Sequence, residues 1–262
     1  MIMKKLTKLT ALALALVMVL GLLAGCGSSN ADSSTDNSGG DTAKAKLVVA
    51  TSPDFPPFES LEGGEVVGIE VDILKLIAKK MDMELDIQQM DFDSVIPGVQ
   101  AGKFDVGMSG ITVTDKRKEN VDFSSVYFMA AQAIVVSADS DITGKADLEG
   151  KKVSVQTGTT AEDYCMANGY EVLAFTANND AASALTGGKV DAWVVDNEVA
   201  LAMAPDLGLT VLDEAMTAEP YAFAFQKGSE LVAPFNEALD ALLADGTVEK
   251  IFSDYGVTYV GP

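Results

Sequence analysis

Two residues have side chains that could together bind a small zwitterion. Arg117 is the single arginine among the 18 Lys and Arg residues of the 262-residue chain. Its planar guanidinium can bind a carboxylate through two parallel hydrogen bonds, which a lysine ammonium cannot do. Asp196 ends an apolar run, where a carboxylate could hold an ammonium group. Each also has a plainer interpretation: a surface arginine, and a helix N-cap at Asp196.

A second polar feature is the segment Thr159-Thr160-Ala161-Glu162. It fits a capping box, in which Thr159 caps a helix and Glu162 bonds back to the helix start. The free N–H groups of a helix start favour an anion, either a carboxylate or an oxyanion. Most such segments only cap a helix, so the cap is the plainer interpretation.

These residues fall in loops that follow predicted strands. Ligands of open α/β sheets bind beyond the carboxyl ends of the strands. That rule selects segments 51–59, 109–112 and 157–160 together with Asp196. We therefore expect these four places to face one cleft.

The elements that must position the loops alternate along the chain. Apolar runs bounded by turn residues predict strands at 47–50, 85–89, 104–108, 153–156, 190–195 and 221–225. Apolar residues between 73 and 81 recur at helical spacing, and two more helical patterns follow residue 234. Alternation of this kind indicates an α/β fold.

A short internal repeat predicts two lobes. Residues 101–107 and 187–193 both place a Gly-Lys-x-Asp step before a short apolar strand. The long apolar stretches 127–137 and 219–226 are candidates for strands that cross between the lobes. We expect the chain to enter the second lobe near residue 130 and to return to the first near residue 222.

The N-terminal residues indicate export. Three lysines precede an apolar run at 9–23, as in a signal peptide. Leu23-Ala24-Gly25-Cys26 then resembles the lipobox of bacterial lipoproteins, whose cysteine is acylated. An ordinary secretory signal is the alternative. We expect a signal peptide at 1–25 and a flexible tether at 26–46, because residues 27–46 have no apolar side chain larger than alanine.

Composition excludes several classes of function. The chain has no histidine and two cysteines, and Cys165 alone remains once Cys26 carries lipid. No intrachain disulfide can then form, and the usual ligands for zinc, copper or haem are missing. We expect no metal and no cofactor. The net charge of −21 disfavours binding to nucleic acid or anionic lipid headgroups.

Three motifs occur in order at 68–73 (GIEVDI), 91–97 (DFDSVIP) and 107–124 (GMSGITVTDKRKENVDFS). They resemble the polar-amino-acid branch of the bacterial solute-binding proteins, family 3, which serve ABC importers. The resemblance covers residues 47 to about 260. It implies an α/β, two-lobed periplasmic-binding-protein-like fold (type II), with each lobe a mixed sheet flanked by helices and two crossing strands between them. The first lobe would comprise 47–130 and 222–262, and the second 131–221.

The resemblance also implies roles for individual residues. The arginine matching Arg117 clamps the ligand α-carboxylate, the acid matching Asp196 takes the α-ammonium, and aromatic residues flank the ligand side chain. Together with the loops chosen above, this gives the candidate ligand contacts Ser52, Asp54, Phe55, Phe92, Ser109, Gly110, Thr112, Arg117, Gln156, Thr159, Thr160 and Asp196.

The side-chain specificity is the open question. Ser52 stands where relatives that bind basic amino acids often have an acid, Gln156 stands where glutamine binders have lysine, and Glu70 replaces a usual aspartate. Asp54 and Glu59 near the first loop, the faces of Phe55 and Phe92, and the strongly acidic chain favour a basic amino acid. A neutral polar amino acid is the alternative.

The function implied is a non-enzymatic one. We expect an extracytoplasmic, lipid-anchored and monomeric protein that binds a polar, preferably basic L-amino acid and delivers it to an ABC permease. An exported dehydratase of the cyclohexadienyl type is one alternative, although it needs an acid or base over the leaving group. An oxyanion receptor is another, although Asp196 would repel its ligand.

Overall fold

The computed structural model of the protein describes residues 44–262. The expectations for the signal peptide, for Cys26 and for most of the tether therefore concern residues outside this range. None of the helices within residues 44–262 is long and apolar enough to cross a membrane.

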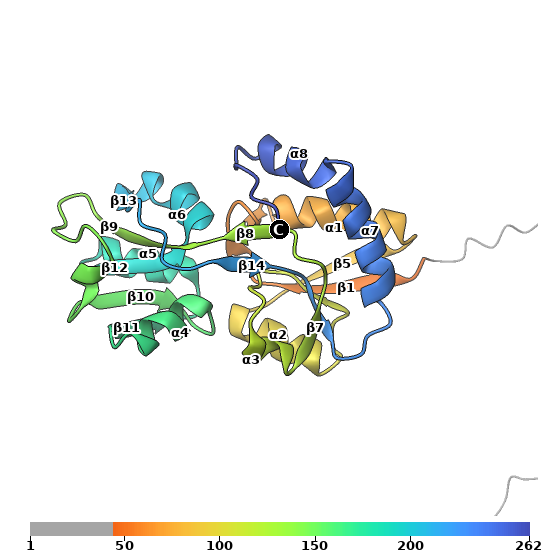
Figure 1. Cartoon of the computed structure of the whole chain (residues 1–262), viewed down its shortest axis with the longest axis horizontal. Helices are drawn as coiled ribbons and strands as arrows, with labels where there is room; N and C mark the ends of the chain where they lie inside the picture. The colour runs from red at the N-terminus through yellow and green to blue at the C-terminus, as the bar shows by residue number, and fades with distance from the viewer. Residues whose placement is uncertain (1–43) are drawn as a thin grey trace, which may run out of the picture. The chain divides into compact units, whose positions relative to one another are not determined.

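The described part contains two five-stranded sheets with the same strand pattern (Figure 1). The first has the order β5-β1-β6-β15-β7. Its strands are β1 (Lys46–Thr51), β5 (Glu84–Gln89), β6 (Val106–Gly107), β7 (Val121–Phe123) and β15 (Ala224–Gln226). β1 runs parallel to both β5 and β6, and β15 is antiparallel to its two neighbours. The strand predicted at 104–108 is confirmed but shorter.

The second sheet has the order β11-β10-β12-β9-β13. Its strands are β9 (Gln132–Ser137), β10 (Lys152–Gln156), β11 (Glu171–Phe175), β12 (Ala192–Asp196) and β13 (Leu209–Val211). β10 runs parallel to both β11 and β12, and β9 is antiparallel to its two neighbours, β12 and β13. The prediction of an α/β fold with two mixed sheets is confirmed.

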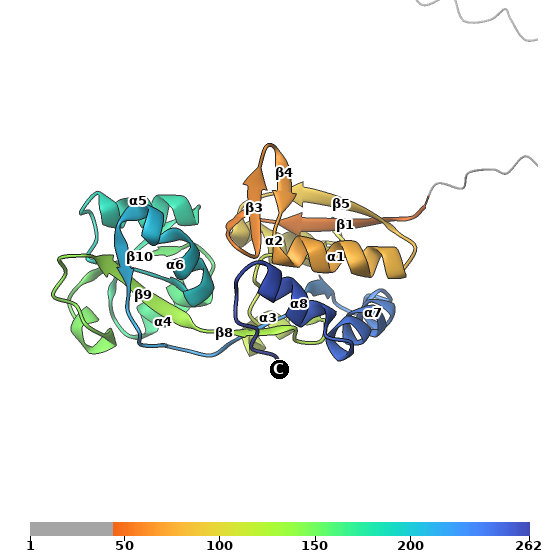
Figure 2. The same ribbon diagram turned by 90° about the horizontal axis from the view of Figure 1, so that it is seen from above.

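Helices cover both faces of each sheet. Against the first sheet lie α1 (Ile69–Lys80), α7 (Val232–Ala244) and α8 (Thr247–Asp254) on one face and α2 (Phe92–Gln100) on the other (Figure 1; Figure 2 shows α1, α7 and α8 from above). Against the second lie α5 (Asn178–Thr186) and α6 (Asn197–Met203) on one face and α4 (Thr160–Ala167) on the other. Strand alternation divides the core accordingly, since Trp193 packs in the α5 layer and Val194 in the α4 layer.

Smaller elements complete the described part. A three-stranded sheet is formed by β2 (Asp54–Phe55), β3 (Glu59–Glu62) and β4 (Glu65–Val67). The remaining helices are α3 (Asp115–Lys118) and the 3-10 turns at Lys145–Leu148 and Pro205–Leu207.

Two strands pass between the sheets, as the sequence predicted. β8 (Phe128–Ala130) and β14 (Glu219–Tyr221) pair antiparallel and run between the two groups of elements (Figure 1). Neither of the long apolar stretches forms one continuous strand. Ala131 separates β8 from β9, and residues 222–223 separate β14 from β15, so each stretch changes pairing partners where it leaves one sheet.

The internal repeat has a structural basis. In each copy a glycine with positive φ, Gly102 at +67° and Gly188 at +65°, ends the helix before the strand. The aspartate of each copy then accepts a 2.8 Å bond from a backbone N–H of the neighbouring strand, Asp105 from Val48 and Asp191 from Lys152. The same local device therefore joins helix and strand in both sheets. The residue boundaries of the two lobes stay a prediction.

Candidate functional site

A small pocket lies between the two lobes and brings together most of the predicted contacts. It has a volume of about 20 Å³ and receives side chains from both lobes. Its lining consists of Phe55, Phe92, Ser109, Gly110, Thr112, Arg117, Gln156, Thr159, Thr160 and Asp196. These are ten of the twelve candidate residues. Ser52 and Asp54 are not among the lining residues and lie behind Gln156 instead.

Arg117 is held in place by its own backbone and by both lobes. Thr114 caps α3, and its hydroxyl accepts a bond from the Arg117 N–H at 3.1 Å. The guanidinium donates to the carbonyl oxygen of Thr112 at 2.9 Å and to that of Gly158 at 3.1 Å. Its Cζ lies 5.6 Å from the centre of the Phe92 ring. Burial lowers the pKa of Arg117, but an arginine remains charged.

Asp196 lies at the opposite side of the same pocket, at the end of β12. It occupies the N-cap position of α6 but makes no capping bond. Its carboxylate instead accepts 2.5 Å bonds from the Gln132 amide and the Tyr221 hydroxyl. The side chain is only 7% exposed. Asp196 is therefore the N-cap residue of α6 by position, as the plainer interpretation predicted, but its carboxylate bonds to Gln132 and Tyr221 and not to the helix start.

The electrostatics around Asp196 favour a positively charged ligand group. Burial, together with Glu219 nearby, raises the pKa of Asp196 to about 8, although Tyr221 and Arg117 act in the opposite direction. Glu219 Oε2 and Gln132 Oε1 are buried acceptors without a hydrogen-bond donor. Two buried acids thus face one arginine in this region. An ammonium group would balance this charge, and an oxyanion would not.

Thr159 and Thr160 confirm the predicted capping box, with one difference. Thr159 Oγ1 accepts from the Glu162 N–H at 3.2 Å, but the Glu162 carboxylate accepts from Gly158, one residue before the cap, at 2.6 Å. Thr159 also donates to the Gln156 carbonyl at 2.7 Å. Thr160 Oγ1 accepts from Gln132 at 3.2 Å. The threonines thus cap α4 and line the pocket at once.

Two glycines allow the close approaches that define the pocket. Gly110 has a φ of +51°, and a Cβ there would lie 2.5 Å from the Phe55 ring. Gly158 has a φ of +80°, and a Cβ there would lie 3.1 Å from Asp93 Cβ. A larger residue at Gly110 would displace Phe55, and one at Gly158 would push α2 and the turn before α4 apart.

The other end of the pocket is formed by Phe55, Phe92, Ser109 and Gln156. The Gln156 amide has no free hydrogen-bonding group there. Its Nε2 donates to the Thr176 carbonyl at 3.1 Å and toward Asp54 at 3.3 Å, and its Oε1 accepts from Asn178 at 2.9 Å. Gln156 therefore presents a fixed and satisfied surface.

Asp54 connects the lobes directly. It belongs to β2, and its carboxylate accepts from the backbone N–H of Asn178 at the start of α5 at 2.7 Å. The Ser52 hydroxyl supports it at 3.0 Å. Burial raises the pKa of Asp54, and these hydrogen bonds oppose the shift. Asp54 thus contacts the second lobe and Ser52 supports it, whereas Phe55 of the same loop lines the pocket.

Several residues that shape the site were not predicted from the sequence as ligand contacts. Gln132 and Tyr221 orient Asp196, and Glu59 and Glu70 lie beneath the 109–110 segment. Tyr221 was visible only as part of an apolar stretch, and Glu70 only as a departure inside a motif. A strand pattern predicts on which face of the sheet a side chain lies, but it does not predict which residues pack against that face.

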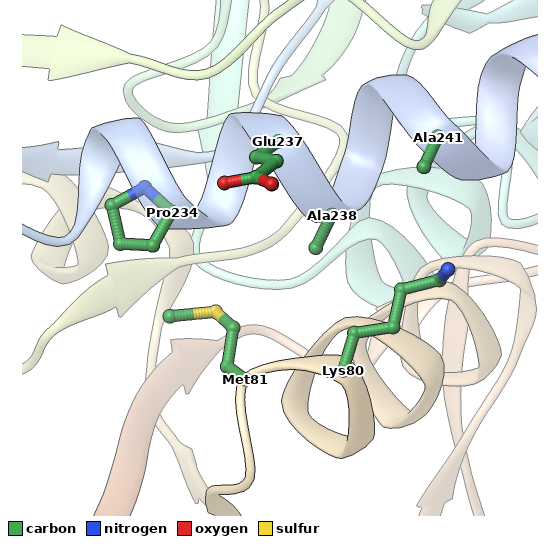
Figure 3. A pocket seen from close by; sticks show the side chains of 6 residues that line it. All are labelled: Lys80, Met81, Pro234, Glu237, Ala238 and Ala241. Atoms are coloured by element: carbon green, nitrogen blue, oxygen red, sulfur yellow. The ribbon is translucent and has the colours of Figure 1, made fainter.

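Other hollows lie away from this pocket. A larger one lies between the end of α1 and α7 and is lined by Lys80, Met81, Pro234, Glu237, Ala238 and Ala241 (Figure 3). It offers one lysine and one glutamate on an otherwise apolar and alanine-rich surface. Among residues 44–262 no group of three Cys, Asp or Glu side chains is placed to hold a metal ion.

Comparison with known families adds to this geometry. Residues 47–258 match the family described as bacterial extracellular solute-binding proteins, family 3. The chain is 36% identical to the arginine-binding extracellular protein ArtP of Bacillus subtilis, over 87% of this chain and 90% of the relative. It is 31% identical to the histidine-binding periplasmic protein of Salmonella typhimurium, over 80% and 87% of the two chains.

Solved structures of amino-acid-binding proteins also match this chain. An ancestral arginine-binding protein bound to arginine matches with a TM-score of 0.76 and 41% identity, covering 81% of this chain and 98% of the other. A second structure, of an ancestral arginine-binding protein bound to glutamine, matches at 42% identity with the same TM-score and coverage. The arginine-, lysine-, histidine-binding protein ArtJ of Geobacillus stearothermophilus matches with a TM-score of 0.77 and 33% identity, covering 83% and 96%.

Proposed function

The chain belongs to family 3 of the bacterial extracellular solute-binding proteins, and from this premise we propose that it captures a basic L-amino acid for an ABC importer. It is a binding protein rather than an enzyme. The observation that carries the proposal is the placement of Arg117 and Asp196 in one pocket between the lobes. This pair of opposite charges fits the head group common to all amino acids.

The head group would bind as follows. The free edge of the Arg117 guanidinium holds the α-carboxylate, and Thr112 and Thr160 provide further polar contacts beside it. Asp196 takes the α-ammonium, which satisfies the buried negative charge shared with Glu219. The lobes close over the ligand, and the closed form docks on the permease.

A basic side chain is favoured by the charge at the other end. Phe55 and Phe92 offer ring faces for a methylene stem or a cation, and Ser109 lies directly above a buried acid. Relatives named for arginine and histidine support this choice. A neutral polar ligand is the second candidate, because the ancestral arginine-binding protein is also described bound to glutamine.

A thermal-shift screen of the twenty amino acids tests the proposal. Binding stabilises the protein by RT ln(1 + [L]/Kd), so a micromolar ligand at millimolar concentration adds roughly 4 kcal/mol. Arginine, lysine or histidine should give the largest shift. If glutamate or aspartate did so instead, the assignment of the pocket would be wrong. Native mass spectrometry of protein purified without refolding would identify the carried molecule independently.

The dehydratase alternative has a separate test. One structural relative is described as an ancestral amino-acid-binding protein that preceded cyclohexadienyl dehydratase. In this chain, Asp196, the one acid lining the pocket, is committed to the head group. Incubation with prephenate or arogenate should therefore give no product above the uncatalysed rate.

The names of the relatives and the N-terminal sequence both bear on where the protein acts. Relatives are named as extracellular and periplasmic proteins, which agrees with an exported chain. We propose further that Cys26 carries a lipid anchor, that the residues between Cys26 and the start of β1 at Lys46 tether the domain to the membrane, and that the protein acts as a monomer. In cells, Cys26→Ser should move the protein from the detergent phase to the aqueous phase while arginine binding stays unchanged. Continued membrane association of the variant would point to an uncleaved signal helix.

A further inference from the structure

We infer that a buried carboxyl pair, Glu59 and Glu70, gives the side-chain end of the pocket its preference for a positively charged amino acid. This inference rests on the proposed function, because it names the groups that select among amino acids held by the same head-group contacts. It concerns residues outside the pocket lining, which act through Ser109 and Gly110.

The two carboxyls lie side by side in the interior. Glu59 begins β3 and Glu70 lies in the first turn of α1, and both side chains are 0% exposed. The Ser109 hydroxyl donates to Glu59 Oε1 at 2.8 Å, and the Gly110 N–H donates to Glu70 Oε2 at 3.0 Å. The Tyr127 hydroxyl donates to Glu70 Oε1. No lysine or arginine of the described part forms a salt bridge with either acid.

The hydrogen bonds around the two carboxyls leave room for one shared proton. Three donors serve four carboxyl oxygens, and the fourth, Glu59 Oε2, is buried without a partner. A proton on Glu59 shared with Glu70 satisfies that oxygen and removes the repulsion between the acids. Burial and the neighbouring Glu70 raise the pKa of Glu59 well above its ordinary value, and Asp54 adds to this shift. The remaining charge has no cation beside it.

Two residues separate that charge from the pocket. Ser109 and Gly110 line the pocket and contact the pair directly. With the head group held at Arg117 and Asp196, the ligand side chain points toward Phe55 and Ser109. A cation placed there would be attracted through a protein interior of low dielectric constant. Asp54 is less suited, because its carboxylate is committed to Asn178 and Ser52.

The test compares arginine with citrulline, a neutral amino acid of nearly the same shape. In wild type, arginine should bind at least about tenfold more tightly than citrulline. In the double variant Glu59→Gln with Glu70→Gln, the arginine affinity should fall about tenfold and the citrulline affinity by less than about threefold. The control Glu62→Gln, an exposed position of the same strand, should change neither.

Two other outcomes would overturn the inference. Equal losses for both ligands would show that the pair only supports the loop, and an unchanged ratio would place the selectivity elsewhere; either overturns the inference. If wild type bound neither ligand, the proposed function itself would fail. If the double variant does not fold, the salt dependence of ligand binding to wild type provides a second test. Its arginine-to-citrulline ratio should change less than about twofold between 0.05 and 0.5 M salt, because a buried charge is poorly screened. A ratio that collapsed in high salt would assign selectivity to surface acids and overturn the inference.

Discussion

The two ends of the pocket are built in different ways. At the head-group end, Arg117 and Asp196 have side chains aimed into the pocket and are oriented by neighbours such as Thr112 and Tyr221. At the side-chain end, the acids do not reach the lining. Asp54 joins the lobes, and Glu59 and Glu70 support the 109–110 segment from behind.

This difference separates affinity from selectivity. Groups that face the ligand directly should control the binding of every amino acid, because all share the head group. Groups that act from behind should change the balance among ligands or between open and closed lobes. Substitutions at the two ends should therefore give distinguishable patterns, and the expected effects decrease from direct contacts to exposed ones.

Arg117→Lys should have the largest effect. The charge is kept, but an ammonium cannot reproduce the bonds to the Thr112 and Gly158 carbonyls while also binding a carboxylate in parallel geometry. Calorimetry should show a loss of about 2–4 kcal/mol in binding free energy for every amino acid that wild type binds. Affinities within a factor of two of wild type would remove Arg117 from the head-group site.

The pH dependence of stability should reveal Asp196. Its folded pKa of about 8 lies above the ordinary value near 4, so the ionised acid disfavours folding. The stabilisation that protonated Asp196 gives to the folded state is complete below pH 4 and is lost as the pH rises through 8. Asp54 and Glu59 act in the same direction.

Denaturant titrations of the ligand-free protein should therefore show Asp196→Asn gaining on wild type by on the order of 2 kcal/mol between pH 4 and pH 8. Parallel curves for the two proteins would mean that the carboxylate is already balanced by a neighbouring cation. Arginine binding to wild type should strengthen over the same interval, since an ammonium needs the ionised acid.

Asp54→Asn should have a smaller and uniform effect. The change weakens a charge-assisted bond to the Asn178 N–H that joins the lobes. We expect all ligands, arginine and citrulline alike, to lose about 1–2 kcal/mol of binding free energy, measured by calorimetry. The exposed neighbour Asp180→Asn serves as the control. A loss confined to basic ligands would instead support the sequence-based expectation that Asp54 touches the ligand.

Lys116→Ala should have the smallest effect. The Lys116 ammonium lies 3.1 Å from Asp163 across the lobes, but the two side chains are 78% and 62% exposed. Water and salt screen such pairs, so the change in arginine affinity should stay below about 0.5 kcal/mol. A larger loss at low salt would indicate that surface charge assists closure.

The sequence predicted the head-group end better than the side-chain end for a physical reason. Thr159 and Glu162 are three residues apart, so their capping box is a local pattern. Asp196 follows from the general rule on strand ends. Asp54, in contrast, meets Asn178 across 124 residues of chain, and no spacing in the sequence marks that contact. The fold itself was accessible because strand and helix periodicities and the Gly-Lys-x-Asp repeat are also local.

The position of Tyr221 has a consequence for the rate of release. Tyr221 lies in β14, one of the two strands that cross between the lobes, and its hydroxyl contacts Asp196. A molecule enclosed by residues of both lobes can leave only after the lobes separate about these strands. The dissociation rate constant therefore cannot exceed the rate constant for opening. Contacts such as Asp54 with Asn178 would then set the residence time of the ligand, even though they do not touch it.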